Sequence, residues 1–212
     1  TIEPASEEEI HSTIKVMGGE DWATWIDTLI NAESIAQGCN TIAFSYVGPS
    51  ATHPIYLDGT LGRAKIDLHQ TSHSLNLEMG NFDGAAYAVV CQAAVTKASV
   101  YIPGLLPYLT ALTTTLEQHH VNEGCIEQMH RLFSDTLYTQ PRPHVDGERL
   151  IRLDNNEIDP SYSLQTHRLL PTINAENFAQ MPSYQKIKSD ILKLNGFGYD
   201  TVDYTKSVNI KK

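Results

Sequence analysis

Tyr56 and Lys65 are the two side chains whose types and spacing could carry proton chemistry. Eight residues separate them. A phenol has an unperturbed pKa of about 10, so it is a poor acid or base at neutral pH unless a nearby ammonium group lowers that pKa. Lys65 could supply the ammonium group and could also donate a hydrogen bond to a ribose hydroxyl. The pair is therefore a candidate proton donor with a charged neighbour.

Helix geometry restricts how these two side chains can meet. On one continuous helix, nine positions of about 100° each place them on opposite faces. Tyr56 must therefore precede the helix that carries Lys65. Pro54 disfavours helix just before it, and Gly59 permits a sharp entry into a helix, so the sequence allows this break. A tyrosine and a lysine at this spacing also occur by chance in most proteins, and the pair alone does not establish catalysis.

The elements that must position the pair form a predicted βαβ unit. Residues 39–46 alternate in polarity, which predicts a strand. Residues 60–79 carry apolar side chains at intervals of three, four and seven, which predicts a helix of about five turns. Residues 85–95 are nearly all apolar, the pattern of a strand covered on both faces in a parallel sheet. The pair would lie beyond the carboxyl end of the first strand, where open α/β sheets bind ligands.

Predicted helices make up most of the remaining chain. A capping-box sequence at Ser6 and Glu9 starts the first of them. The others follow apolar stripes, from Trp22 to Gly38, Leu105 to Leu116, Ile126 to Leu137 and Ile187 to Leu194. Residues 139–171 are rich in Pro, Asp and Asn and predict a long surface excursion, with 149–153 as its only strand-like piece. Two strands cannot cover this many helices, because a buried strand needs neighbours to satisfy its backbone groups. We therefore expect part of a larger sheet protein.

Composition and charge exclude several classes of protein. The 212 residues are 41% apolar, which is enough for a globular core. The formal net charge of -10 argues against nucleic acid and anionic membranes as general partners. No apolar run approaches the roughly 20 residues of a membrane span, and nothing resembles a signal peptide, so we expect a cytoplasmic protein. The cysteines and histidines lack metal-site spacing, so no metal is expected. The sequence also lacks a GxSxG elbow and a GxGxxG loop of its own.

The motifs around the pair resemble those of the FabV-type enoyl-acyl carrier protein reductases and their relatives, the trans-2-enoyl-CoA reductases. The Tyr-x8-Lys motif in this setting is specific to that family. The resemblance runs from end to end of the chain, but it covers only about the C-terminal half of the family's polypeptide. The matching segments are Thr13–Trp22, Phe44–Pro49, Pro54–Tyr56 with Gly59–Gly62 and Lys65, Val95–Ser99 with Ile102-Pro103, and Leu194–Phe197 with Val202–Tyr204.

This resemblance implies an α/β fold, namely the C-terminal half of a Rossmann-type parallel sheet of the short-chain dehydrogenase/reductase kind, with additional helices. Residues 1–212 would be the catalytic and substrate-binding half of a single domain. The glycine-rich phosphate loop and the acidic residue that selects NADH over NADPH, which the family carries upstream, have no counterpart here. The chain also begins at Thr1 without a methionine, as an excised fragment would, although removal of an initiator methionine would look the same. We therefore expect the N-terminal nucleotide-binding half to be a partner, as a separate chain or a missing segment.

The resemblance also implies residue roles. Tyr56 matches the family's proton donor, and Lys65 matches its cofactor-contacting lysine. Tyr46 matches the tyrosine that contacts the substrate thioester. The stretch Ala94, Val95 and Thr96 matches a backbone and hydroxyl contact to NADH.

The implied activity is NADH-dependent reduction of the trans-2 double bond of enoyl-acyl carrier protein in fatty acid synthesis. A first alternative is a trans-2-enoyl-CoA reductase, which the net charge slightly favours because acyl carrier proteins are themselves acidic. A second alternative, of another class, is a non-catalytic acyl-binding or assembly module whose tyrosines only pack. Departures from the family pattern at Ala51–His53 and Asp58 touch the rim of the expected site and leave the acyl-chain preference open.

Overall fold

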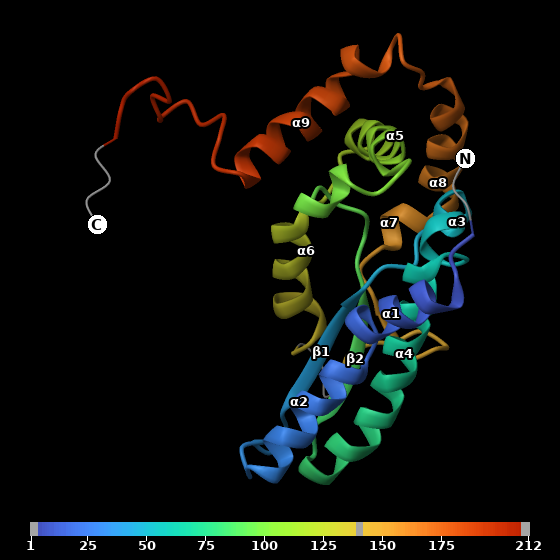
Figure 1. Cartoon of the computed structure of the whole chain (residues 1–212), viewed down its shortest axis with the longest axis vertical. Coiled ribbons are helices and arrows are strands. Elements are labelled where there is room, and N and C mark those ends of the chain that lie inside the picture. The colour runs from blue at the N-terminus through green and yellow to red at the C-terminus, as the bar shows by residue number, and fades with distance from the viewer. Residues whose placement is uncertain (1–3, 139–141, 209–212) are drawn as a thin grey trace.

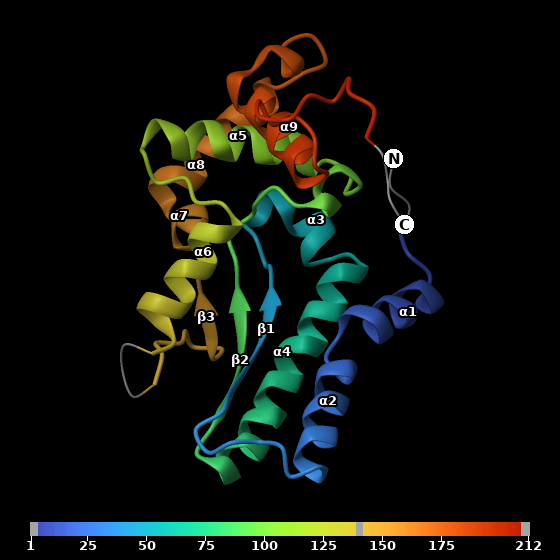
Figure 2. The same ribbon diagram turned by 90° about the vertical axis from the view of Figure 1, so that its left-hand side faces the viewer.

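The computed structural model describes residues 4–138 and 142–208, which contain a three-stranded parallel sheet. The strands are β1 (Asn40–Ser45), β2 (Ala85–Val90) and β3 (Leu150–Arg152), with β2 in the centre. Asn40 lies opposite Ala85 in the first pairing, and Ala88 lies opposite Leu150 in the second. Because all pairings are parallel, the carboxyl ends of the strands meet at one edge of the sheet, which is uppermost in Figure 2. The predicted α/β class is confirmed.

Helices cover both faces of the sheet and the edge where the strands end (Figure 1). They are α1 (Glu7–Met17), α2 (Glu20–Asn31), α3 (His53–Tyr56), α4 (Thr60–Met79), α5 (Leu105–Gln118), α6 (Cys125–Arg131), α7 (Asn155–Ile158), α8 (Pro160–Leu169) and α9 (Pro182–Leu194). A π-helical turn, Leu132–Thr136, extends α6. Helix α4 packs along β2, and α5, α8 and α9 lie beyond the carboxyl ends of the strands (Figures 1 and 2).

Strand β2 is apolar throughout because helices bury both of its faces. Tyr87 and Val89 pack against Leu132 after α6 on one side. Ala86, on the opposite side, packs against Met79 of α4. Successive side chains of a strand point to opposite faces, so a strand buried on both faces needs an apolar residue at every position. The strand ends at Val90, five residues before the predicted end at position 95, because the chain then leaves the sheet.

Two other boundaries differ from the sequence prediction. Helix α2 ends at Asn31 rather than near Gly38, and Glu33 has a left-handed φ of 52°, which a continuing helix does not allow. Within the predicted surface excursion over 139–171, the strand-like piece 149–153 is confirmed by β3, but the prediction that it lies on the surface is wrong. Ile151 and Leu153 are fully buried there, because β3 pairs with β2 as a third strand. Residues 139–141 of that prediction lie outside the described residues.

None of the helices within residues 4–138 and 142–208 combines the length and the apolar character needed to cross a membrane.

Candidate functional site

An apolar cavity of about 410 Å³ lies at the carboxyl ends of β1 and β2. Phe44 and Tyr46 reach it from the end of β1, and Tyr56 reaches it from the end of α3. Ala94 and Thr96 line it from the loop that follows β2. The first residues of α5 and of α6 close the remaining wall. The structure therefore brings together four of the six side chains that the sequence singled out.

A break between α3 and α4 allows Tyr56 to face this cavity. Tyr56 is the last residue of α3, and α4 begins at Thr60 after Gly59, whose backbone is extended with φ -84° and ψ -177°. Gly62 makes the break tight, because a Cβ atom at this position would lie 2.1 Å from the carbonyl oxygen of Leu57. Tyr56 and Lys65 are thus on different helices. The geometric condition for their convergence is confirmed.

Tyr46 and Tyr56 are in direct contact in the wall of the cavity. Their ring centroids are 4.6 Å apart and their planes meet at 78°, an edge-to-face arrangement. The Tyr46 hydroxyl donates to a carboxylate oxygen of Glu157 at 2.6 Å. Among the described residues, the Tyr56 hydroxyl has no hydrogen-bond partner. Of these two phenols, the one of Tyr56 is therefore free to donate to a molecule in the cavity.

The electrostatic environment of Tyr56 differs from the expectation. Burial, followed by the negative charge of Glu157, raises the pKa of Tyr56 to about 12. The expected lowering by the Lys65 ammonium group is not what the structure shows. A phenol with a raised pKa stays protonated at neutral pH. Tyr56 is thus suited to donate a hydrogen bond or a proton, and is not suited to act as a base.

Lys65 lies in the second turn of α4 and reaches the end of β1. Its amino nitrogen donates to the backbone carbonyl oxygen of Phe44 at 3.3 Å. Burial lowers the pKa of Lys65. Lys65 does not line the cavity that contains Tyr56, but both residues adjoin the same strand end.

The loop from Gln92 to Thr96 is held rigidly beside the cavity. Gln128 of α6 accepts from the backbone N–H of Gln92 at 2.9 Å and donates to its carbonyl oxygen at 3.3 Å. Ser99 accepts from the backbone N–H of Thr96 at 2.9 Å and donates to the carbonyl oxygen of Ala94 at 3.2 Å. The backbone groups of this loop therefore have fixed directions next to Tyr46 and Tyr56.

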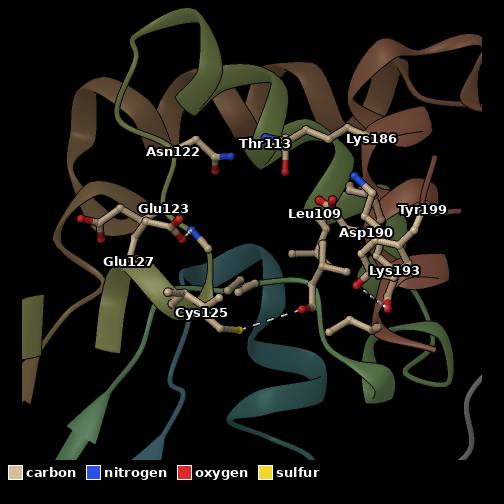
Figure 3. Close-up of a pocket in the computed structure, with 17 residues that line it drawn as sticks. Leu109, Thr113, Asn122, Glu123, Cys125, Glu127, Lys186, Asp190, Lys193 and Tyr199 are labelled. Atoms are coloured by element: carbon tan, nitrogen blue, oxygen red, sulfur yellow. Dashed lines mark hydrogen bonds between the residues drawn. The ribbon is translucent and has the colours of Figure 1, made fainter. Parts of the chain in front are cut away.

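A second cavity, of about 480 Å³, adjoins the first and is lined by Val95 (Figure 3). Ala93, Ala94 and Cys125 belong to both cavities. In Figure 3, Lys186, Asp190 and Lys193 of α9 lie on one side of this cavity, and Glu123 and Glu127 lie on the other. Of the predicted NADH-contacting stretch, Ala94 and Thr96 therefore line the first cavity, and Val95 lines the second.

Glu157 of α7 is the residue that the sequence reasoning missed. Its side chain is fully buried and touches the site through Tyr46. No motif surrounds it, and it lies in the stretch that was interpreted as a surface excursion. The available signal was the strand-like stretch 149–153 just before it, in which Leu150, Ile151 and Leu153 are apolar.

No group of three or more metal-ligating side chains is found in the part of the chain that the structure describes.

Comparison with protein families finds two matches. Residues 1–138 match the family described as the trans-2-enoyl-CoA reductase catalytic region. Residues 145–208 match a family described as the enoyl reductase FAD binding domain.

Curated relatives are similar over the full chain. The chain is 62% identical, over 211 residues, to an enoyl-[acyl-carrier-protein] reductase [NADH] 2 of Vibrio parahaemolyticus. This match covers 100% of the chain and 53% of that relative. It is 61% identical over 210 residues to an enoyl-[acyl-carrier-protein] reductase [NADH] of Vibrio cholerae, with 99% of this chain and 52% of the relative covered. The chain thus spans about half the length of the curated relatives that it matches.

Solved structures share the fold. The Treponema denticola trans-2-enoyl-CoA reductase in complex with NAD superposes with a TM-score of 0.90 and 37% identity, over 99% of this chain and 53% of that one. A Clostridium trans-2-enoyl-CoA reductase in complex with NAD gives a TM-score of 0.92 and 36% identity, over 97% of this chain and 53% of that one.

Proposed function

The chain belongs to the family described as the trans-2-enoyl-CoA reductase catalytic region, and from that membership we propose that it carries the catalytic residues for NADH-dependent reduction of the trans-2 double bond of enoyl thioesters. The observation that carries this proposal is the Tyr56 hydroxyl. It lines an apolar cavity beyond the strand ends and, in the described part of the chain, has no partner of its own. A free, protonated phenol in such a cavity is a donor for a substrate oxygen.

The first cavity suits the nicotinamide end of NADH, which supplies a hydride when bound. Its wall is mainly apolar, and Ala93 and Ala94 present only methyl groups beside the fixed loop backbone. A flat ring with one polar amide fits such a wall. Within the described residues, none of the three strands leads into a glycine-rich phosphate loop. The phosphates and adenine would therefore be held by other residues than those of this chain.

Tyr56 would stabilise the charge that develops on the substrate. Addition of a hydride to the β-carbon of an enoyl thioester moves negative charge onto the thioester oxygen, as an enolate. A hydroxyl that donates to this oxygen lowers the barrier, and removal of one such donor typically costs about 3 kcal/mol. A proton must then reach the α-carbon, from Tyr56 directly or from solvent. The raised pKa of Tyr56, about 12, keeps the phenol protonated for this role.

Lys65 would hold the nucleotide rather than activate Tyr56. Its ammonium group is anchored at the end of β1 through the carbonyl oxygen of Phe44. Two further N–H bonds of an ammonium group remain available for a ribose hydroxyl. This role requires no lowering of the pKa of Tyr56.

The N-terminal half of the family's polypeptide would complete both the sheet and the nucleotide site. Strand β1 is an edge strand of the described sheet, and Phe44 on it is 46% exposed beside the cavity. An edge strand has unpaired backbone groups, and proteins normally pair such a strand with another strand or cover it with a helix or loop. An exposed aromatic ring beside it also marks a surface that another segment contacts. We therefore propose that residues 1–212 form the C-terminal half of a single Rossmann-type domain.

A flavin does not fit the segment whose family description mentions FAD. The strand-to-helix connection of residues 145–208 runs from β3 to α7, a helix of four residues. Asp154 at the start of α7 and Glu157 within it are both fully buried carboxyl groups. The pyrophosphate of a dinucleotide binds at a helix N-terminus, where backbone N–H groups donate to it and no negatively charged side chain repels it. We assign no step to FAD.

The test of this proposal uses the assembled enzyme, meaning this chain together with the N-terminal half that its relatives carry, joined or added separately. It is mixed with NADH and either a trans-2-enoyl-CoA or an enoyl-acyl carrier protein. The expected result is loss of NADH absorbance with formation of an equal amount of saturated thioester, measured by mass spectrometry. Binding of NADH without reduction of either thioester would contradict the proposal. Binding of acyl ligand without any nucleotide would favour an acyl-binding module instead.

The rates on the two thioesters decide between the substrate classes. The relatives with 61% and 62% identity carry names that specify the acyl carrier protein, whereas the solved structures with 36% and 37% identity carry names that specify CoA. Because the higher identity lies with the first group, we propose the carrier-protein thioester as the preferred substrate and the CoA thioester as the alternative.

A further inference from the structure

Glu157 is a buried carboxylate that receives three hydrogen bonds. Its side chain is 0% exposed. Oε1 accepts from the hydroxyl of Tyr46 at 2.6 Å and from the hydroxyl of Tyr108 at 2.5 Å. Oε2 accepts from the backbone N–H of Ala93 at 2.7 Å. Burial of a carboxylate is costly unless such bonds satisfy it, so this arrangement has a structural or functional reason.

The three donors come from different elements that converge on the site. Tyr46 directly follows β1, and Ala93 lies in the loop after β2. Glu157 itself lies in α7, which follows β3, and Tyr108 belongs to α5, which covers the strand ends. One carboxylate therefore connects the carboxyl ends of all three strands of the described sheet with the helix above them.

The hydrogen-bond pattern fits the ionised form of Glu157. An ionised carboxylate only accepts, and all three partners here donate. Burial raises the pKa of Glu157, while the hydrogen bonds from Tyr108, Tyr46 and Ala93 oppose that rise. A protonated Oε2 would place its own hydrogen against the N–H of Ala93.

The direction of the Tyr46 proton follows from this pattern. Because Tyr46 donates its proton to Glu157, it presents only oxygen lone pairs and its ring to the cavity. Its ring is then fixed edge-on to the ring of Tyr56, 4.6 Å away between centroids. The two neighbouring phenols thus have different roles, with Tyr46 held in place and Tyr56 free to donate.

We propose that Glu157 is the positioning residue of this site: it fixes Tyr46 against Tyr56, so that the thioester oxygen meets the hydroxyl of Tyr56 alone. This inference rests on the proposed reductase activity. Glu157 does not touch the substrate and acts through Tyr46.

A double-mutant cycle separates this role from a purely structural one. The variants are Glu157→Gln, Tyr46→Phe and the two combined, each in the assembled enzyme and each assayed well below its own melting temperature. Misplacement of reacting groups can cost up to about 100-fold in rate, and we expect Glu157→Gln to lower kcat by about tenfold or more with a smaller change in KM. In the Tyr46→Phe background the same substitution should change kcat by less than about twofold, because the residue through which Glu157 acts has lost its hydroxyl.

Tyr108→Phe is the matched control for the cycle. It removes the other phenol hydroxyl from the same oxygen of Glu157, at a buried residue that is not among those lining the first cavity. It should lower the melting temperature with little change in kcat. If Glu157→Gln does not fold, the same cycle is measured with Glu157→Asp. This substitution keeps the negative charge but shortens the side chain by one methylene group, so the carboxylate lies farther from Tyr46.

The outcomes are distinct. Equal losses of kcat from Glu157→Gln in both backgrounds, or wild-type kcat in Glu157→Gln, would overturn the inference while the reductase activity stands. A loss of kcat in Tyr108→Phe as large as in Tyr46→Phe would also overturn it, because the network would then serve the fold alone. An assembled wild-type enzyme that reduces no enoyl thioester would reject the proposed function, and the inference with it.

Discussion

The ring of Tyr56 meets the ring of Tyr46 edge-on, with 4.6 Å between their centroids. This contact depends on the interruption between α3 and α4, since Tyr56 ends one helix and the next begins at Thr60. The position of the proposed proton donor is therefore set by a turn of three residues, Leu57–Gly59, and by the glycine that packs against it.

Gly62 is the first test of that turn. The Cβ atom of an alanine would lie 2.1 Å from the carbonyl oxygen of Leu57, so the turn must move if Gly62→Ala is to fold. Overpacking of this kind typically costs about 1–3 kcal/mol. We expect a lower melting temperature and at least about a tenfold loss of kcat, because Tyr56 moves with the turn.

Gly80→Ala is the matched control at the other end of α4. Gly80 has an ordinary helical φ of -57°, and no atom lies within 4 Å of its Cβ position. Turnover should be unchanged in this variant. Wild-type kcat in Gly62→Ala would show that the turn does not position Tyr56.

The pH dependence of the reaction distinguishes Lys65 from Tyr56. Burial lowers the pKa of Lys65 from its ordinary value of 10.5, so the ammonium group is lost at a lower pH than in a free lysine. The pKa of Tyr56 is about 12, so the phenol remains protonated over that range. As pH rises, kcat/KM for NADH should therefore fall, with an apparent pKa below 10.5. In Lys65→Met the value of kcat/KM should be lower at every pH, and this alkaline fall should be absent. The measurement is a pH–rate profile of both enzymes. An alkaline fall that persists unchanged in Lys65→Met would assign it to another group.

Arg152 is expected to hold the end of β3 together. It donates to the fully buried carboxylate of Asp154 at 2.8 and 2.5 Å. Removal of one partner leaves a buried charge without compensation, which typically costs about 3–5 kcal/mol. We expect Arg152→Leu to unfold at a much lower urea concentration than the wild type.

The comparison for Arg152 is Lys206→Leu, which removes an exposed ion pair with Asp203. Water already solvates both of these groups, so stability should barely change. If both variants unfold at the wild-type urea concentration, the buried ion pair does not stabilise β3.

The sequence predicted those parts of the fold in which the local pattern is long. The helix Thr60–Met79 and the strand around Asn40–Ser45 appear where the periodicity placed them, and the break after Tyr56 falls at Gly59 as expected. The expectation that Pro54 disfavours helix just before it is wrong, because Pro54 lies in the first turn of α3. These features are decided by residues that are neighbours in the chain.

The features that the sequence did not predict arise from contacts between distant segments. Strand β3 falls within the strand-like stretch 149–153, but its burial was not predicted, because that burial depends on β2, which offers it backbone partners. Glu157 is buried by partners 49, 64 and 111 residues away in the chain. The pKa of Tyr56 rises rather than falls because the fold buries its hydroxyl and, to a smaller extent, because it brings the negative charge of Glu157 near.

The most direct measurement is the steady-state kinetics of Tyr56→Phe in the assembled enzyme, with NADH affinity measured by fluorescence titration on the same preparation. Loss of an oxyanion donor typically lowers kcat by about 10²–10³. We predict a loss of this size or greater with an almost unchanged Kd for NADH, while Tyr101→Phe, at a side chain that is 84% exposed, behaves as the wild type. Undiminished turnover by Tyr56→Phe would contradict the assignment of Tyr56 as the proton donor.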